Sequence, residues 1–189
     1  MPRIDPKPLS RYPFFVRWVL RRQHRKYGRI LAPSLLWGRL PGPFVAILAA
    51  LGAFQARRFP IDPALRSLVS IRVAQLNGCD FCVDLNSHNF LRASGAEDKA
   101  VAVDRWREST RYTDRERAAI EYAEAMTERC AGIDDRCLES LRTHFDDDEI
   151  TGLTAWIAFQ NMSAKFNAAL GAEEHGFCRL PGAQPPGAD

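Results

Sequence analysis

Signals that start and stop helices recur along this chain, whereas signals for β-strands are nearly absent. Asp62-Pro63 places a capping carboxylate before a proline in the first helical turn, and apolar residues then share one face over 64–76. Thr113 and Glu116 have the spacing of a capping box. The expected helices cover 12–27, 44–57, 64–76, 79–95, 96–103, 115–129, 134–144 and 149–170. This pattern predicts an all-α fold.

Length and composition favour one globular core. The chain has 189 residues, of which 46% are hydrophobic and 26% charged. We expect a basic helical arm over 1–40, a helical domain over 41–178 and a disordered tail over 179–189, which is rich in Pro and Gly. The apolar run 44–54 is far shorter than the ~20 residues of a membrane-spanning helix, so we interpret it as a buried helix. No export signal is recognisable, which predicts a cytoplasmic protein without a membrane span.

Two cysteines stand where a helix is expected to begin. Cys79-Asp80-Phe81-Cys82 follows Asn77-Gly78, which breaks the preceding helix, and a helix-compatible stretch comes next. The start of a helix carries about half a positive charge and free backbone N–H groups, so a thiol there ionises more readily. The thiolate is the nucleophilic form. The pair is therefore suited to disulfide exchange.

The other cysteines do not complete a zinc site. Cys130, Cys137 and Cys178 stand singly, without a second pair or histidines at ligand spacing. The cytosol keeps structural thiols reduced, so the five cysteines do not indicate a disulfide scaffold. We therefore expect no metal, a redox role for Cys79 and Cys82, and inert burial for the other three.

The first segment is strongly basic. Residues 1–40 hold ten Lys or Arg against one Asp, a balance of +9, which leaves −6 for the remainder. Between 12 and 27, aromatic and apolar residues recur at near-helical spacing among five cations. Such a helix could lie on an anionic membrane or bind nucleic acid. We favour an ordinary helix that packs its aromatic residues on the core or on a neighbouring subunit, with no nucleic acid bound.

The central sequence resembles a known family. The stretch from Leu65 to Asp84, LRSLVSIRVAQLNGCDFCVD, is similar to the core of the carboxymuconolactone decarboxylase and alkylhydroperoxidase D-like family. Residues 116–127 and 150–171, the latter ending in Phe166-Asn167-Ala-Ala-Leu-Gly171, look like its later helices. The resemblance implies an alkylhydroperoxidase D-like helical bundle, homo-oligomers that are commonly trimers or hexamers, and thiol-dependent peroxide reduction.

The resemblance also assigns roles. It implies that Cys82 attacks the hydroperoxide and that Cys79 then resolves the sulfenic acid as a disulfide. Reduction would come from an outside dithiol, either a lipoyl-bearing protein as in the family or a thioredoxin-like one. No cofactor is expected.

Two positions depart from the family pattern. A glutamate twelve residues before the first cysteine and a histidine four after the second relay protons in the family, and this chain has Ser67 and Asn86 there. Asn86 could hydrogen-bond a thiolate or peroxide oxygen but cannot act as a base. His88 lies about 120° around the helix from Cys82 and ~9 Å along it, so direct contact with that sulfur is not expected.

Three functions stay open at this point. The motif favours peroxide reduction by the two cysteines. A helical ligand-binding or assembly module without this chemistry is the first alternative. A cofactor-free lactone decarboxylase is weaker, because no base stands at the relay positions, although His24, His144 or His175 could enter the site from elsewhere.

Overall fold

The computed structural model describes residues 3–128 and 133–178. Every regular element in these two ranges is helical, so the predicted all-α class is confirmed. The helices are η1 Leu9–Arg11, α1 Phe14–Tyr27, α2 Ala32–Trp37, α3 Pro41–Phe54, α4 Pro63–Leu76, α5 Asp80–Ser94, α6 Glu97–Ala102, η2 Val103–Glu108, α7 Asp114–Glu128, α8 Asp135–Arg142 and α9 Asp147–Ala169. Cys130 and the tail 179–189, expected to be disordered, lie outside the described residues.

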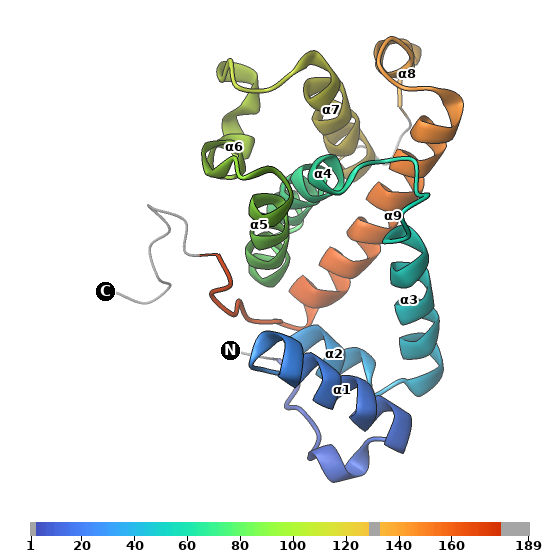
Figure 1. The fold of residues 1–189 in the computed structure, drawn as a ribbon, viewed down its shortest axis with the longest axis vertical. Helices are drawn as coiled ribbons and strands as arrows, with labels where there is room; N and C mark the ends of the chain where they lie inside the picture. Colours follow the sequence, from blue (N-terminus) through green and yellow to red (C-terminus); the bar gives the residue numbers. More distant parts are fainter. Residues whose placement is uncertain (1–2, 129–132, 179–189) are drawn as a thin grey trace.

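Helix α4 lies at the centre of the bundle, packed by α5, α7 and α9 (Figure 1). One apolar cluster joins α4 to α7 and α9, and a second joins α4 to α5 and the α6–η2 segment. Helices α1 and α2 lie at one end of the molecule, while α7 and α8 lie at the other (Figure 1). This arrangement encloses the start of α5 between α9 and the N-terminal arm.

Caps predicted from sequence begin two of the central helices. The Asp62 carboxylate accepts the N–H groups of Ala64 and Leu65, each at 2.9 Å, and starts α4. At α7, the Glu116 carboxylate accepts the backbone N–H of Thr113 at 2.8 Å, and the Thr113 hydroxyl accepts the N–H of Glu116 at 3.2 Å. Both predicted caps are confirmed.

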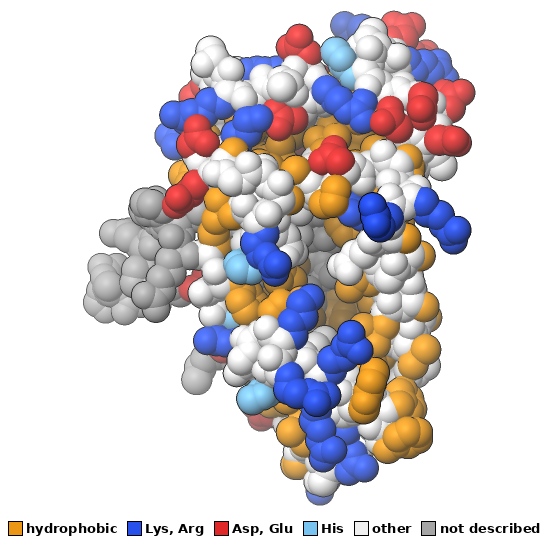
Figure 2. Space-filling model, viewed as in Figure 1, with side chains coloured by type: hydrophobic (Ala, Val, Ile, Leu, Met, Phe, Trp, Pro, Cys, Tyr) orange, Lys and Arg blue, Asp and Glu red, His pale blue; other side chains and the backbone are white. Residues whose placement is uncertain are grey.

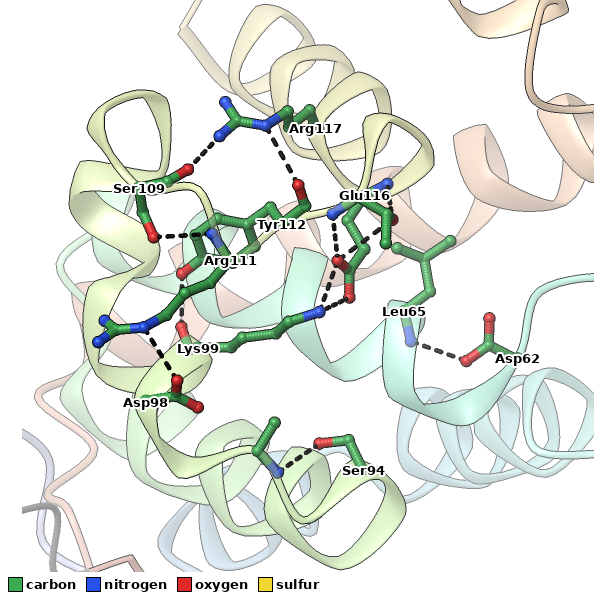
Figure 3. Close-up of polar contacts among 12 residues, drawn as sticks. Asp62, Leu65, Ser94, Asp98, Lys99, Ser109, Arg111, Tyr112, Glu116 and Arg117 are labelled. Atoms are coloured by element: carbon green, nitrogen blue, oxygen red, sulfur yellow. Dashed lines mark hydrogen bonds and ion pairs between the residues drawn. The ribbon is translucent and has the colours of Figure 1, made fainter.

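The Glu116 carboxylate also ties α7 to α6. It contacts the Lys99 ammonium at 2.7 Å, and the Tyr112 hydroxyl donates to the carbonyl oxygen of Lys99 at 2.6 Å (Figure 3). Burial and the nearby Glu116 raise the pKa of Tyr112 to about 12, so this donor stays protonated at neutral pH. The cap of α7 thus also fixes the segment that covers α5 on its outer side.

Helix α3 differs from its prediction. It begins at Pro41 rather than at 44, because proline fits the first turn of a helix, where its missing N–H is not needed. It was expected to be buried, but Phe44 is its one buried residue. Phe44 and Leu48 pack on α1, and Phe54 packs on Trp156 of α9. Since α3 is apolar all round and has neighbours on one side, its other side is open.

The arm is helical, as predicted, but its aromatic residues divide between two faces. Val16 and Leu20 of α1 are buried, whereas Phe14 and Trp18 are 77% and 57% exposed. Phe14 and Trp18 therefore do not pack on the core of this chain, and packing on a neighbouring subunit, the other part of the expectation, stays a prediction. Helix α2, which the sequence did not predict, follows and stacks Trp37 on Phe166 of α9, with ring centroids 3.7 Å apart. No described helix combines the length and the apolar content needed to cross a membrane.

Candidate active site

The two cysteines lie at the start of α5. Cys79 caps the helix, and its Sγ accepts the backbone N–H of Cys82 at 3.3 Å. The two Cα atoms are 5.2 Å apart, and the sulfurs are joined as a disulfide. This Cα separation is within the usual range for a disulfide. When the pair is reduced, the sulfurs lie next to the positive end of the α5 dipole.

Both cysteines are buried. Cys79 is 1% exposed and Cys82 is 3% exposed. Leu31 and Leu36 of the arm cover them, together with Ala172, which follows α9. Helix α2 and the segment after α9 thus cover this end of α5. A molecule from solvent therefore reaches the two sulfurs only when this cover moves.

Asn167 donates a hydrogen bond to the sulfur of Cys82. Its Nδ2 lies 3.3 Å from Cys82 Sγ, and the residue is 1% exposed. Its side-chain oxygen, Oδ1, has no hydrogen-bond partner among the described residues. Burying an amide group without a hydrogen-bond partner costs free energy. A hydrogen bond to a charged acceptor is also stronger than one to a neutral acceptor, so the Asn167 N–H stabilises the Cys82 sulfur most when that sulfur is a thiolate. Asn167 belongs to the stretch 166–171, one of the stretches on which the family resemblance was based, but sequence reasoning gave it no role.

The residues at the two relay positions hydrogen-bond backbone carbonyl oxygens. Asn86 Nδ2 donates to the carbonyl oxygen of Cys82 at 2.7 Å, and the Ser67 hydroxyl donates to the carbonyl oxygen of Pro63 at 2.8 Å. His88 packs its ring on Phe177 instead, at 6.0 Å between centroids. The hydrogen bond that the structure gives to the Cys82 sulfur thus comes from Asn167 and not from Asn86.

Residues 172–178, here called the C-terminal segment, are held on α5 by Asp84. The buried Asp84 carboxylate accepts the backbone N–H groups of His175 and Phe177 at 3.0 Å and of Cys178 at 2.7 Å. Asp84 lies two residues after Cys82, on a different face of the helix. A charged acceptor with three donors therefore fixes the segment that covers the disulfide.

His175 joins the C-terminal segment to the arm. Its Nε2 accepts the backbone N–H of Ala32 at 3.1 Å, and its ring stands edge-on to Phe81, with centroids 5.4 Å apart. Burial and the nearby Arg29 lower the pKa of His175, against the opposing effects of Asp84 and Glu173. The neutral imidazole is the form that accepts a hydrogen bond. Of the three histidines considered from sequence, His175 contacts the cysteine turn, while His24 is exposed on α1 and His144 follows α8.

Comparison with known proteins places the chain in a family. Residues 44–125 match the model of the carboxymuconolactone decarboxylase family. Over 174 residues the chain is 42% identical to the uncharacterized protein YnjA of Escherichia coli, covering 92% of this chain and 96% of YnjA. The chain belongs to the carboxymuconolactone decarboxylase family. The uncharacterized protein YdfG of Bacillus subtilis is 29% identical over 112 residues, which cover 59% of this family member and 76% of YdfG.

Solved structures share the fold of this family member. An alkylhydroperoxidase AhpD core, an uncharacterized peroxidase-related protein from Ralstonia eutropha, superposes with a TM-score of 0.83 at 19% identity, covering 93% of each chain. A putative antioxidant defence protein AhpD from Agrobacterium tumefaciens has a TM-score of 0.67 at 29% identity, covering 71% of this chain and 92% of its own. The debrominase Bmp8 has a TM-score of 0.77 at 23% identity, covering 91% of each chain. The predicted alkylhydroperoxidase D-like bundle is confirmed.

Proposed function

We propose that this member of the carboxymuconolactone decarboxylase family reduces hydroperoxides through a Cys79/Cys82 dithiol–disulfide cycle. The observation that carries the proposal is the placement of the two sulfurs. They lie within bonding distance at the positive end of α5, and a buried amide donates to Cys82 Sγ at 3.3 Å. The peroxidase-related proteins that share the fold support the same chemistry.

In the first step the Cys82 thiolate attacks the outer oxygen of the hydroperoxide. A sulfur–oxygen bond forms, the O–O bond breaks, and the alkoxide takes up a proton to leave as an alcohol. Cys82 is then a sulfenic acid. Positions 67 and 86 hold no carboxylate or imidazole. The α5 N-terminus and the Asn167 N–H are therefore the groups that stabilise the attacking thiolate.

In the second step the Cys79 thiol attacks the Cys82 sulfenic acid. The disulfide forms and water leaves, so two thiols have supplied the two electrons that reduce the peroxide. An external dithiol, such as a lipoyl-bearing or thioredoxin-like protein, then restores both thiols by disulfide exchange. Because neither Ser67 nor Asn86 can act as a general base, we expect proton transfer to pass through water and turnover to be slow.

We further propose that the protein acts in the cytoplasm as a homo-oligomer. The open apolar side of α3 supports the assembly, because Val45 is 49% exposed and most of the other α3 residues are small or apolar. Light scattering after gel filtration tests the assembly. A monomer at micromolar concentration would contradict it.

The peroxidase proposal is tested by thiol counting and intact-protein mass. The reduced protein receives one equivalent of cumene hydroperoxide, beside a Cys82→Ser variant and a matched Cys137→Ser control. We expect the wild type and the control to lose two thiols and two hydrogens rapidly, and Cys82→Ser to lose neither. Equal oxidation rates in all three would sink the proposal and favour the ligand-binding alternative.

The same experiment should include other substrates. One neighbour in fold, the debrominase Bmp8, is known in complex with 2,3,4-tribromopyrrole as a C82A variant. A brominated pyrrole therefore serves as the comparison substrate, with bromide release as the readout. Faster Cys82-dependent debromination than peroxide reduction would reassign the substrate, while the dithiol cycle would stand. Decarboxylation of a lactone acid in the Cys82→Ser variant would overturn both.

A further inference from the structure

Helix α1 has an inner face and an outer face of different chemistry. Val16 and Leu20 point into the molecule and are at most 1% exposed. At about 100° per residue, five residues project from the opposite side of the same helix. These residues, here called the outer face of α1, are Phe14, Trp18, Arg21, Arg22 and Arg25. The outer face thus begins with two aromatic rings and continues with three guanidinium groups.

The described residues do not neutralise the charges of this outer face through ion pairs. Within the described part of the chain, none of its three guanidinium groups forms an ion pair with a carboxylate. The Arg22 guanidinium lies 5.8 Å from the centre of the Trp18 ring. Figure 2 shows Lys and Arg side chains gathered over the end of the molecule where Figure 1 places α1, with hydrophobic side chains beside them, while most acidic side chains lie at the other end.

We propose that the outer face of α1 docks the protein on an anionic lipid bilayer. Guanidinium groups bind phosphate, and tryptophan favours the boundary between headgroups and acyl chains. The exposed side chains of Phe14 and Trp18 would be transferred from water into that boundary. A nucleic acid would also neutralise the arginines, but contact with its phosphates alone would leave the exposed aromatic side chains in water. A bilayer would bind the arginines through its phosphate groups and would also take up the two aromatic rings.

Docking by this face would also place the dithiol close to the bilayer. The residues that follow α1 lie between this helix and the disulfide, because Leu31 and Leu36 cover Cys79 and Cys82. The sulfurs are therefore separated from the bilayer by α1 and by the turn and helix α2 that follow it, about two layers of helix or roughly 20 Å. If the proposed peroxidase function holds, peroxidised acyl chains become the substrate class. The docking itself does not depend on that function.

The test is cosedimentation with vesicles, using the full chain. Vesicles of phosphatidylcholine with phosphatidylglycerol are compared with pure phosphatidylcholine, over a series of NaCl concentrations. The variant is Arg21→Gln/Arg22→Gln/Arg25→Gln. The matched control, Arg57→Gln/Arg58→Gln/Arg92→Gln, removes the same charge from exposed arginines elsewhere. We expect the wild type and the control to bind the anionic vesicles, with affinity that falls as salt rises.

The outer-face variant should bind about 100-fold more weakly, from roughly fivefold per arginine. A Trp18→Ala variant should also lose the blue shift of tryptophan emission that vesicles cause in the wild type. Circular dichroism checks that each variant is folded. Equal binding by variant and control, or equal binding to neutral vesicles, would overturn the proposal. Loss of self-association or of RNA binding by the outer-face variant, with vesicle binding unchanged, would instead assign the face to a second copy or to nucleic acid.

Discussion

Replacing Asn167 tests whether its amide stabilises the Cys82 thiolate. Asn167→Ala removes the N–H that lies 3.3 Å from Cys82 Sγ and leaves the sulfur in place. A hydrogen bond to a charged group contributes about 1.5–3 kcal/mol, and we take the lower end because sulfur is a weak acceptor. At about 1.4 kcal/mol per decade, the thiolate fraction at neutral pH should fall roughly tenfold.

The reaction rate should fall less than the thiolate fraction. A thiolate that is less stabilised is also more nucleophilic, with a Brønsted slope of about 0.4–0.5, so the rate at neutral pH should fall about threefold. At a pH where both proteins are fully ionised, the order reverses and the variant should react about threefold faster. This crossing of the two pH profiles is the signature of a lost thiolate donor.

The assay is the rate of iodoacetamide alkylation as a function of pH. Both proteins carry Cys79→Ser, so that Cys82 is the thiol of the motif that reacts, and its peptide is followed by mass spectrometry. The matched control is Asn161→Ala, which removes another amide from α9, one that bonds Thr127 at 3.0 Å. The control should keep the wild-type profile.

One result would refute the reasoning. If Asn167→Ala raises or lowers the rate by the same factor at every pH, the amide affects access to the sulfur and not its ionisation. A wider opening beside the sulfur produces such a uniform rise. The peroxidase cycle would then depend on the α5 N-terminus alone to ionise Cys82.

Three further predictions concern stability. Asp84→Asn should lower the free energy of unfolding by about 2 kcal/mol in urea and speed amide exchange at 175–178, because three N–H groups lose a charged acceptor; unchanged exchange would contradict this. The fold lowers the pKa of His175. The neutral imidazole therefore contributes to the stability of the fold in full above its ordinary pKa near 6.5, and this contribution to stability is lost as the pH falls from there through the lowered pKa. The wild type should therefore lose more melting temperature between neutral and acidic pH than His175→Gln, and parallel losses would rule this out. Gly152→Ala should lower the free energy of unfolding by about 1–3 kcal/mol, because its Cβ would lie 2.6 Å from Pro60. Gly52→Ala, whose Cβ would meet no atom within 4 Å, should not destabilise the protein. Equal melting temperatures for the two variants would contradict this packing.

Local chemistry explains why so much of the helical pattern could be predicted. Asp62, Thr113 and Glu116 act within one turn of their own helices, so their caps follow from spacing alone. The position of Cys79 and Cys82 at the start of α5 follows for the same reason, since Asn77-Gly78 ends one helix and the next begins at once. The class of fold and the dithiol pair were therefore determined by the sequence itself.

The rest depends on which helices meet. Asn167 reaches Cys82 across 85 residues of chain, and Asp84 holds a segment more than 90 residues away. Such contacts leave no periodicity or spacing in the sequence. The apolar pattern of α3 could not show that one side stays open, because an apolar run has the same composition whether or not a neighbour covers it. Tertiary packing alone decided that the sulfur has an amide donor, that the dithiol is covered, and that Phe14 and Trp18 face outward.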